Sequence, residues 1–229
     1  MNYTLIILGI ILILVLYVLY RFIYDRQTTI NEMEYLKDGV SDVKFENLAN
    51  PGSVRYTYSI WVYAQQADAN DIFYIHDSDT AGTTGAYRFK LHVTTAGELK
   101  YTISHKPDTA VEDKDYIITS NFPFQKWVCV AISVDNNIID SYLDGKLVKS
   151  QQIKDIQGPT SKNSTIKHGK GDMYIAKFER LDTPIDPQTA WNMYMAGNGG
   201  SYISNAFASY GANLILTKDQ VDTKKFILF

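Results

Sequence analysis

The chain has 229 residues, of which 45% are hydrophobic and 13% aromatic, and its formal net charge is −3. A weakly acidic chain lacks the positive field that holds nucleic acid, so we expect no nucleic-acid partner. A single cysteine, Cys129, excludes an intramolecular disulfide, and its β-rich surroundings predict a buried, inert thiol. This length allows one sizeable domain with appendages.

The N-terminal residues 3–20 are uncharged and consist almost wholly of Leu, Ile, Val and Tyr. With the apolar tail that follows Arg21, the stretch reaches the length of about 20 residues that spans a bilayer. No basic region precedes it and no small-residue cleavage site follows it, which disfavours a cleaved signal peptide. The sequence therefore predicts a transmembrane anchor over residues 1–24, with the lipid bilayer as the partner of residues 3–24. The anchor residues singled out are Tyr3, Leu12, Tyr17 and Tyr20, the tyrosines suiting the interfacial belts.

Two arginines, Arg21 and Arg26, lie just C-terminal to this stretch. The positive-inside rule then keeps the C-terminal side in the cytosol. We therefore expect a single-pass protein of a host membrane or a virion internal membrane, with its soluble domain on the cytosolic or capsid side. The unpaired Cys129 agrees with a reducing compartment. The glycosylation sequon Asn163–Thr165 points the other way, although such triplets are common by chance.

Residues 25–50 are polar and mixed, and they predict a juxtamembrane linker. Within it we expect a short helix over Thr29–Lys37 and an entry strand near Val43–Leu48. From residue 53 a period-2 alternation of apolar and polar residues dominates, which is typical of half-buried strands. The first strand, Arg55–Ala64, puts one set of side chains on one face and the alternate set on the other: Tyr56, Tyr58, Ile60 and Val62 against Thr57, Ser59, Trp61 and Tyr63.

Further strands follow, separated by turns and loops. They are expected over Ile72–His76, Tyr87–Val93, Leu99–Ser104, Tyr116–Thr119, Asp172–Leu181, Asn213–Thr217 and Lys225–Phe229. A long loop is expected over residues 157–171. One short helix is predicted, because Asp186 is a good N-cap, Pro187 suits the first helical position and Gly197 is a good terminator. Many short strands with almost no helix predict an antiparallel β-sandwich.

The most regular stretch is WVCVAISVDNNIIDSYLDGKLVKS, residues 127–150. It predicts three antiparallel strands joined by two tight turns. The second turn contains Asp144-Gly145, a pair that favours a type I′ hairpin because both central residues need positive φ. Asn136 in the first turn also tolerates that conformation.

This meander resembles the centre of the concanavalin A-like lectin/glucanase superfamily, in its laminin G-like form. YTYSIWVYA, YRFKLHV followed by LKYTIS, and GDMYIAKFERLDTPIDPQTAWNMYMAG are similar to other strands of that family and to the short helix that follows them. The resemblance implies an all-β antiparallel jelly-roll sandwich with one short helix over residues 51–229, preceded by a single transmembrane helix. It does not specify a ligand.

The glucanase branch of the family carries a Glu-x-Asp-x-Glu strand that supplies two catalytic carboxyls. This sequence lacks that spacing. Its nearest acidic cluster, Glu112–Asp115, is expected in a solvated loop without the alternation that points two carboxyls to one face. We therefore expect a non-enzymatic protein with no catalytic residues.

Calcium is the cofactor that the resemblance leaves open. Related domains often bind the ion at the rim of the sandwich through Asp and backbone oxygens, and the corresponding candidates are Asp68, Asp71, Asp77 and Asp79. Asp is also an ordinary turn residue, which is the alternative. The four histidines show no zinc-binding spacing. Trp61 and Tyr63 are candidates for stacking on a sugar ring, against the alternative that aromatic residues on a sheet face pack in the core.

Small anchored versions of this fold are familiar among large double-stranded DNA viruses. By that resemblance we expect a minor capsid or virion-membrane protein that tethers a membrane to other structural proteins, including capsid proteins. The alternative is a membrane-anchored lectin that binds glycan. A glycan-active hydrolase is a second alternative, disfavoured by the missing pair of carboxyls.

Overall fold

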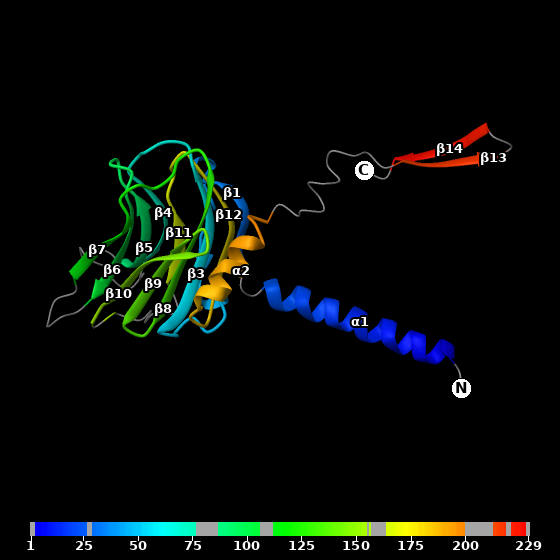
Figure 1. Cartoon of the computed structure of the whole chain (residues 1–229), viewed down its shortest axis with the longest axis horizontal. Helices are drawn as coiled ribbons and strands as arrows, with labels where there is room; N and C mark the ends of the chain where they lie inside the picture. Colours follow the sequence, from blue (N-terminus) through cyan, green and yellow to red (C-terminus); the bar gives the residue numbers. More distant parts are fainter. Residues whose placement is uncertain are drawn as a thin grey trace. The chain divides into compact units, whose positions relative to one another are not determined.

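The computed structural model describes residues 3–26, 29–76, 87–105, 112–154, 156, 164–199, 213–218 and 221–227. The chain divides into two units, Met1–Asn198 and Gly199–Phe229. The first unit contains a helix, α1 (Tyr3–Arg26), and a sandwich of two six-stranded sheets with one short helix, α2 (Pro187–Met195) (Figure 1). The strand pairings given for the chain are all antiparallel, as the sequence predicted.

The two sheets, here sheet A and sheet B, share the strands evenly. Sheet A has the order β1 (Thr29–Tyr35), β12 (Met173–Leu181), β3 (Arg55–Ala64), β8 (Trp127–Asp135), β9 (Ile138–Leu143) and β10 (Lys146–Gln152). Sheet B has the order β2 (Val43–Lys44), β11 (Thr165–His168), β4 (Asn70–His76), β5 (Tyr87–Val93), β6 (Leu99–His105) and β7 (Glu112–Thr119). Strands distant in sequence therefore lie side by side, as β12 does between β1 and β3.

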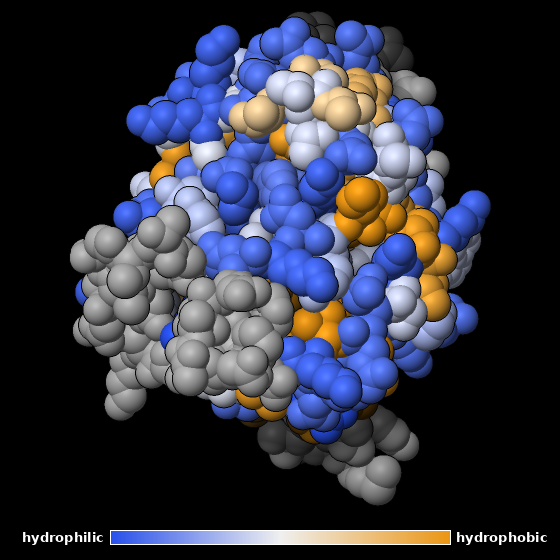
Figure 2. Space-filling view, turned by 90° about the vertical axis from the view of Figure 1, so that its left-hand side faces the viewer, coloured by the Kyte–Doolittle hydropathy of each residue, from blue (hydrophilic) through white to orange (hydrophobic). Residues whose placement is uncertain are grey.

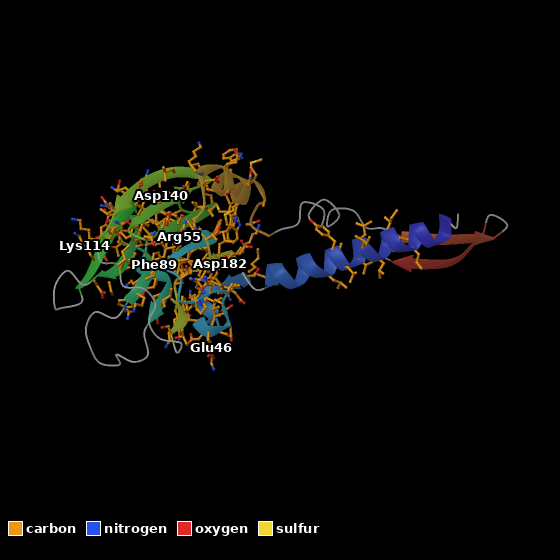
Figure 3. All side chains as sticks on the ribbon, turned by 90° about the horizontal axis from the view of Figure 1, so that it is seen from below. Glu46, Arg55, Phe89, Lys114, Asp140 and Asp182 are labelled. Atoms are coloured by element: carbon orange, nitrogen blue, oxygen red, sulfur yellow. The ribbon has the colours of Figure 1, made fainter. Side chains whose placement is uncertain are left out.

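The core fills the space between the sheets. The predicted faces of β3 are confirmed, since Tyr56, Tyr58, Ile60 and Val62 all belong to the core cluster. Tyr58 contacts the rings of Phe73 and Phe89 from sheet B at 5.2 and 5.4 Å. Figure 3 shows Phe89 inside the sandwich and Lys114 at its periphery. The alternation of apolar and polar residues thus sets which side of each strand faces the core.

The meander over residues 127–150 is also confirmed as β8, β9 and β10. Asp144 and Gly145 have φ values of 47° and 74°, the positive values that a type I′ turn requires at both central positions. Asn136 in the first turn has φ of 55°. Turn chemistry readable from the sequence therefore fixes this part of sheet A.

The expected linker over residues 25–50 is wrong for most of its length. Thr29–Tyr35 forms β1 instead of a helix, and it pairs with β12 along the edge of sheet A. Val43–Lys44 is a short strand of sheet B followed by a turn of 3₁₀ helix, Phe45–Asn47, instead of a strand through residue 48. Leu36 and Phe45 are buried in the core. The stretch looked like a linker because an edge strand leaves many of its residues exposed and can therefore be polar.

Three further expectations differ from the structure. The expected loop over residues 157–171 contains strand β11, which joins β2 to β4 in sheet B. Strand β7 begins at Glu112, four residues before the expected Tyr116. The two C-terminal strands, β13 (Asn213–Lys218) and β14 (Val221–Ile227), pair with each other as a two-stranded sheet in the second unit. The sandwich therefore begins before residue 51 and does not continue to residue 229.

Helix α1 covers the predicted anchor. The described apolar side chains between Leu8 and Leu19, Leu12 and Tyr17 among them, are 49–68% exposed. The side chains of Tyr3 and Tyr20 lie outside the described residues. In the part of the chain that is described, no helix has both the length and the apolarity needed to cross a membrane. The transmembrane anchor stays a prediction.

Candidate functional site

A row of four aromatic side chains crosses the outer face of sheet A. Tyr35 on β1 is the direct partner of Tyr174 on β12, Tyr174 is the partner of Tyr63 on β3, and Tyr63 is the partner of Trp127 on β8. Directly paired residues of neighbouring strands place their side chains on the same face of a sheet. We call these four residues the aromatic row. With strands about 4.8 Å apart, it extends over about 14 Å perpendicular to the strands.

The rings of the row contact one another in sequence. Tyr35 and Tyr174 are stacked, with ring centroids 4.4 Å apart. Tyr63 meets Tyr174 edge-on at 6.3 Å and contacts Trp127 at 5.7 Å. Tyr174 is 36% exposed and the other three side chains are half-buried. Mutual contact therefore fixes the rings while part of each remains accessible from solvent.

The Tyr35 end of the row carries a carboxylate. The Tyr35 hydroxyl donates a hydrogen bond of 2.6 Å to Oδ1 of Asp172. This bond, together with partial burial and the charges of Asp172 and Asp38, raises the pKa of Tyr35 to about 12. At the other end, Lys126 lies next to Trp127 and forms an ion pair of 3.7 Å with Asp144. The hydroxyl of Tyr35 thus stays protonated and held in place at neutral pH.

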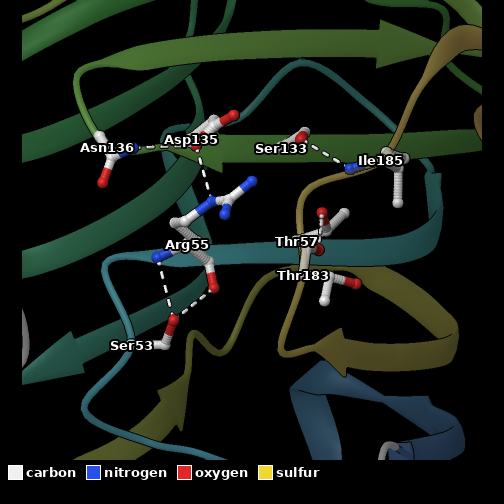
Figure 4. A network of polar contacts seen from close by, with 8 residues as sticks. All are labelled: Ser53, Arg55, Thr57, Ser133, Asp135, Asn136, Thr183 and Ile185. Carbon is white, nitrogen blue, oxygen red and sulfur yellow. Dashed lines mark hydrogen bonds and ion pairs between the residues drawn. The ribbon is translucent and has the colours of Figure 1, made fainter.

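Helix α2 covers the part of the face beside the row, and polar contacts from the preceding segment hold it there. The Thr57 hydroxyl donates to the carbonyl of Thr183 at 2.9 Å, and the amide of Ile185 donates to Oγ of Ser133 at 3.0 Å (Figure 4). Asp186 accepts a hydrogen bond of 2.7 Å from the amide of Thr189, as an N-cap does. Hydrogen bonds from the side chain of Thr189 and from its amide lower the pKa of Asp186. The predicted helix and its cap are confirmed.

Trp61 lies under α2, so the expectation that it stacks on sugar is wrong. Its ring stacks on that of Tyr194 in α2 at 5.7 Å, and Trp61 is only 7% exposed. It forms a small cluster with Ala176 and Cys129 on the outer face of sheet A. Burial raises the pKa of Cys129 to about 12, which agrees with the predicted inert thiol. Of the two predicted stacking residues, only Tyr63 belongs to the aromatic row.

The outer face of sheet B is polar and contrasts with that of sheet A. Lys90 pairs with Asp71 at 2.9 Å, and the Thr102 hydroxyl donates to Asp115 at 2.7 Å. Nε2 of His92 lies 3.9 Å from Oδ2 of Asp115, and burial is the main cause that lowers the pKa of His92. Figure 2 shows that the side where β7 and β10 lie is largely hydrophilic. The large apolar side chains that are exposed on these two strands are those of Ile117, Leu147 and Val148.

The acidic cluster near residue 112 is in a strand and not in a loop. Asp113 and Asp115 are two positions apart on β7, so both carboxylates point to the same face of sheet B, contrary to the expectation. Asp113 accepts a hydrogen bond from the Ser104 hydroxyl, and Asp115 accepts one from Thr102. Hydroxyl groups of β6 therefore engage both carboxylates.

Of the four calcium candidates, only Asp68 and Asp71 lie in the described part of the chain. The carboxylate of Asp68 accepts a hydrogen bond from the amide of Ala69 at 2.8 Å, which is the turn role given as the alternative. Asp71 is the ion-pair partner of Lys90. Asp77 and Asp79 lie outside the described residues. Among the described residues, no three His, Cys, Asp or Glu side chains are grouped so that they could hold a metal ion.

A family model described as the Concanavalin A-like lectin/glucanases superfamily matches residues 37–192, more than half of the chain. The chain belongs to this superfamily. The match begins just after β1 and ends within α2, so the aromatic row falls within the matched residues except for Tyr35. No curated protein sequence matches the chain.

Solved structures share the lectin-like fold of this superfamily member. The ligand-binding domain of botulinum neurotoxin serotype D in complex with N-acetylneuraminic acid is 13% identical, with a TM-score of 0.51 over 73% of this chain and 46% of that chain. The binding domain of Paraclostridial Mosquitocidal Protein 1 is 14% identical, with a TM-score of 0.50 over 72% of this chain and 47% of that chain. This chain thus spans less than half the length of either. At such identities the likeness concerns the fold alone.

Proposed function

We propose that the sandwich is a non-enzymatic, lectin-like domain that binds carbohydrate on the aromatic row. The observation that carries the proposal is the direct pairing of Tyr35, Tyr174, Tyr63 and Trp127 across four neighbouring strands. Aromatic faces carry negative charge density, and the C–H groups on one side of a sugar ring pack favourably against them. Tyrosine hydroxyls beside the rings supply the hydrogen bonds that sugars also need.

The contrast between the two outer faces supports this choice of surface. On sheet B the outward polar groups bond to one another, as Lys90 does with Asp71 and Thr102 with Asp115. On sheet A the row brings four partly exposed aromatic residues together. Partly exposed, braced Tyr and Trp side chains lose little conformational entropy on binding. Aromatic residues attract several classes of ligand, and membership of a superfamily that contains lectins favours glycan among them.

The test is glycan-array binding by the full chain in detergent, with two variants. Tyr174→Ala removes the most exposed ring of the row. This ring also contacts both of its neighbours in the row, Tyr35 and Tyr63. Trp191→Ala is the matched control, because Trp191 is 41% exposed on α2 and is not part of the row. We expect at least about tenfold weaker binding for Tyr174→Ala, which corresponds to 1.4 kcal/mol, and unchanged binding for Trp191→Ala. Equal losses, or no binding by any of the three proteins, would contradict the proposal.

A membrane-anchored role is a second candidate, and the exposed apolar helix supports it. The apolar side chains described between Leu8 and Leu19 are all about half exposed or more. A contiguous exposed apolar surface of this kind indicates a site that a partner covers. A lipid bilayer is the partner that suits a long apolar helix. The test is flotation of the full chain with liposomes after a carbonate wash. Replacing Leu12 and Leu16 by Lys should release the protein, whereas retention of the double variant would contradict an anchor.

A further inference from the structure

We propose that the aromatic row takes the interior of an extended, uncharged oligosaccharide and not a terminal acidic sugar. The inference rests on the proposed function, because it names the class of glycan for the same surface. Three features carry it: the length of the row, its open ends and the charges around it.

The row is longer than a site for one sugar ring needs to be. Its four members belong to β1, β12, β3 and β8, and the pairing places them side by side along about 14 Å. Ring contacts continue from each member to the next without a gap. A ligand that uses all four rings is therefore elongated and lies perpendicular to the strands. Each additional sugar unit that reaches another ring adds contact area.

Among the described strands, none closes either end of the row. Tyr35 lies on β1, which is the edge strand of sheet A. At the opposite end, the pairing of β8 with β9 extends from Asp135 only to Val130, so Trp127 has no partner on β9. A surface open at both ends lets a chain continue in both directions. A pocket for a terminal sugar, in contrast, encloses the end of the chain.

The charges near the row disfavour an acidic ligand. Asp172 bonds to the Tyr35 hydroxyl, and Asp38 is close enough to contribute to the raised pKa of the same group. The cation beside Trp127, Lys126, is already paired with Asp144. Because the Tyr35 hydroxyl donates its hydrogen to the bond with Asp172, the remaining lone pairs of its oxygen and the second oxygen of Asp172 are left as acceptors. Acceptors at that end suit the hydroxyl groups of a neutral sugar and repel a carboxylate.

The experiment measures calorimetric affinities of the full chain for two ligand series. One series is the cello-oligosaccharides from monosaccharide to hexasaccharide; the other comprises N-acetylneuraminic acid and galacturonate oligomers of matched length. We expect affinity to rise at least about tenfold from the monosaccharide to the tetrasaccharide, with no measurable binding of the acidic series. Asp172→Asn removes one negative charge at the row and should make binding of the galacturonate oligomers detectable. Asp135→Asn is the matched control, because it removes one negative charge from an exposed residue at the end of β8 opposite Trp127, and it should not have this effect.

The outcomes separate the two proposals. Binding of the acidic series that is lost in Tyr174→Ala, with no dependence on length, overturns this inference and leaves a glycan-binding row intact. Binding of neutral oligosaccharides that does not strengthen beyond the monosaccharide overturns it as well. Failure of every glycan on the array overturns the proposed function itself. Thermal unfolding is measured for each variant. A midpoint within a few degrees of the parent's shows that the variant is folded, so that a loss of binding comes from the altered surface.

Discussion

The guanidinium group of Arg180 donates a hydrogen bond of 2.6 Å to the carbonyl oxygen of Ala49, deep inside the protein, where Arg180 is only 1% exposed. It also donates to the carbonyl of Asn50 at 3.3 Å and lies 5.3 Å from the ring centroids of Phe45 and Tyr56. Carbonyl oxygens and ring faces thus compensate the burial of a cation. The arginine joins β12 to the segment that precedes β3.

Replacing Arg180 by Met should destabilise the sandwich by about 3 kcal/mol, because the carbonyl groups of Ala49 and Asn50 lose the donor that the buried guanidinium group supplies. Urea unfolding followed by tryptophan fluorescence measures the change. Arg55→Met is the matched control: Arg55 pairs with Asp135 at 2.8 Å, but its side chain is 55% exposed. An exposed pair contributes at most about 1 kcal/mol. Equal unfolding midpoints for the two variants would show that Arg180 does not join these segments as described.

Replacing Trp61 by Ala should cost about 3–5 kcal/mol, because it removes a large buried side chain between β3 and α2. Loss of its contact with Tyr194 should also loosen α2, which hydrogen exchange of the amides of residues 190–196 would reveal. Trp191→Ala is the comparison, and we expect it to change stability by less than about 1 kcal/mol, since Trp191 is 41% exposed whereas Trp61 is 7% exposed. Similar exchange rates in both variants would argue against Trp61 as the contact that holds α2.

Stability should fall as the pH is lowered through the range in which His168 titrates. Burial lowers the pKa of His168 to about 4, against 6.5 in the unfolded chain, while Asp42 opposes part of this shift. Between these two values the unfolded chain binds more protons, so the contribution of neutral His168 is present above pH 6.5 and is lost as pH falls toward 4. The loss is at most about 3 kcal/mol.

His168→Leu should therefore flatten the dependence of unfolding free energy on pH between 6.5 and 4. His92, whose pKa is also lowered, is present in both proteins, so the difference between the two pH profiles isolates His168. Denaturant unfolding at half-unit pH steps measures the profiles. Parallel profiles for the parent and the variant would contradict the assignment.

Gly169 lies where a side chain cannot fit. A Cβ atom at this position would be 1.9 Å from the carbonyl oxygen of Asp71, and only a shift of the backbone could relieve that contact. Gly169→Ala should therefore lower stability by about 1–3 kcal/mol, as overpacking does. Gly52→Ala is the control, since a Cβ there meets nothing within 4 Å. Thermal unfolding compares the two, and equal midpoints would refute a close approach of β4 to residue 169.

Features that depend on neighbours along the chain were predictable. The alternation in Arg55–Ala64 placed Tyr63 on the face opposite Ile60 and Val62, and Asp144-Gly145 defined the hairpin. The cap formed by Asp186 marked the start of α2. Each of these follows from a local rule that involves only a few consecutive residues.

The aromatic row depends on the register between distant strands, which no local pattern contains. Tyr35 and Tyr174 come from opposite ends of the sandwich sequence, and Tyr35 lies in a stretch whose polarity suggested a linker. The cover that α2 provides over Trp61 is likewise a tertiary feature, because alternation alone cannot distinguish an outer face that is exposed from one that a helix covers. A row of paired Tyr and Trp residues becomes recognisable only when the strand order is known.

Only Gln27 and Thr28 separate α1 from β1, and β1 belongs to the edge of sheet A. If α1 were held in a membrane and a ligand were bound to Tyr174, Tyr63 and Trp127, tension between the two would enter β1 at Thr29 and pass to β12 through the pairing of these strands. Hydrogen bonds between antiparallel strands are perpendicular to the strands. A pull along β1 would therefore act across the bonds between β1 and β12 and load them in shear.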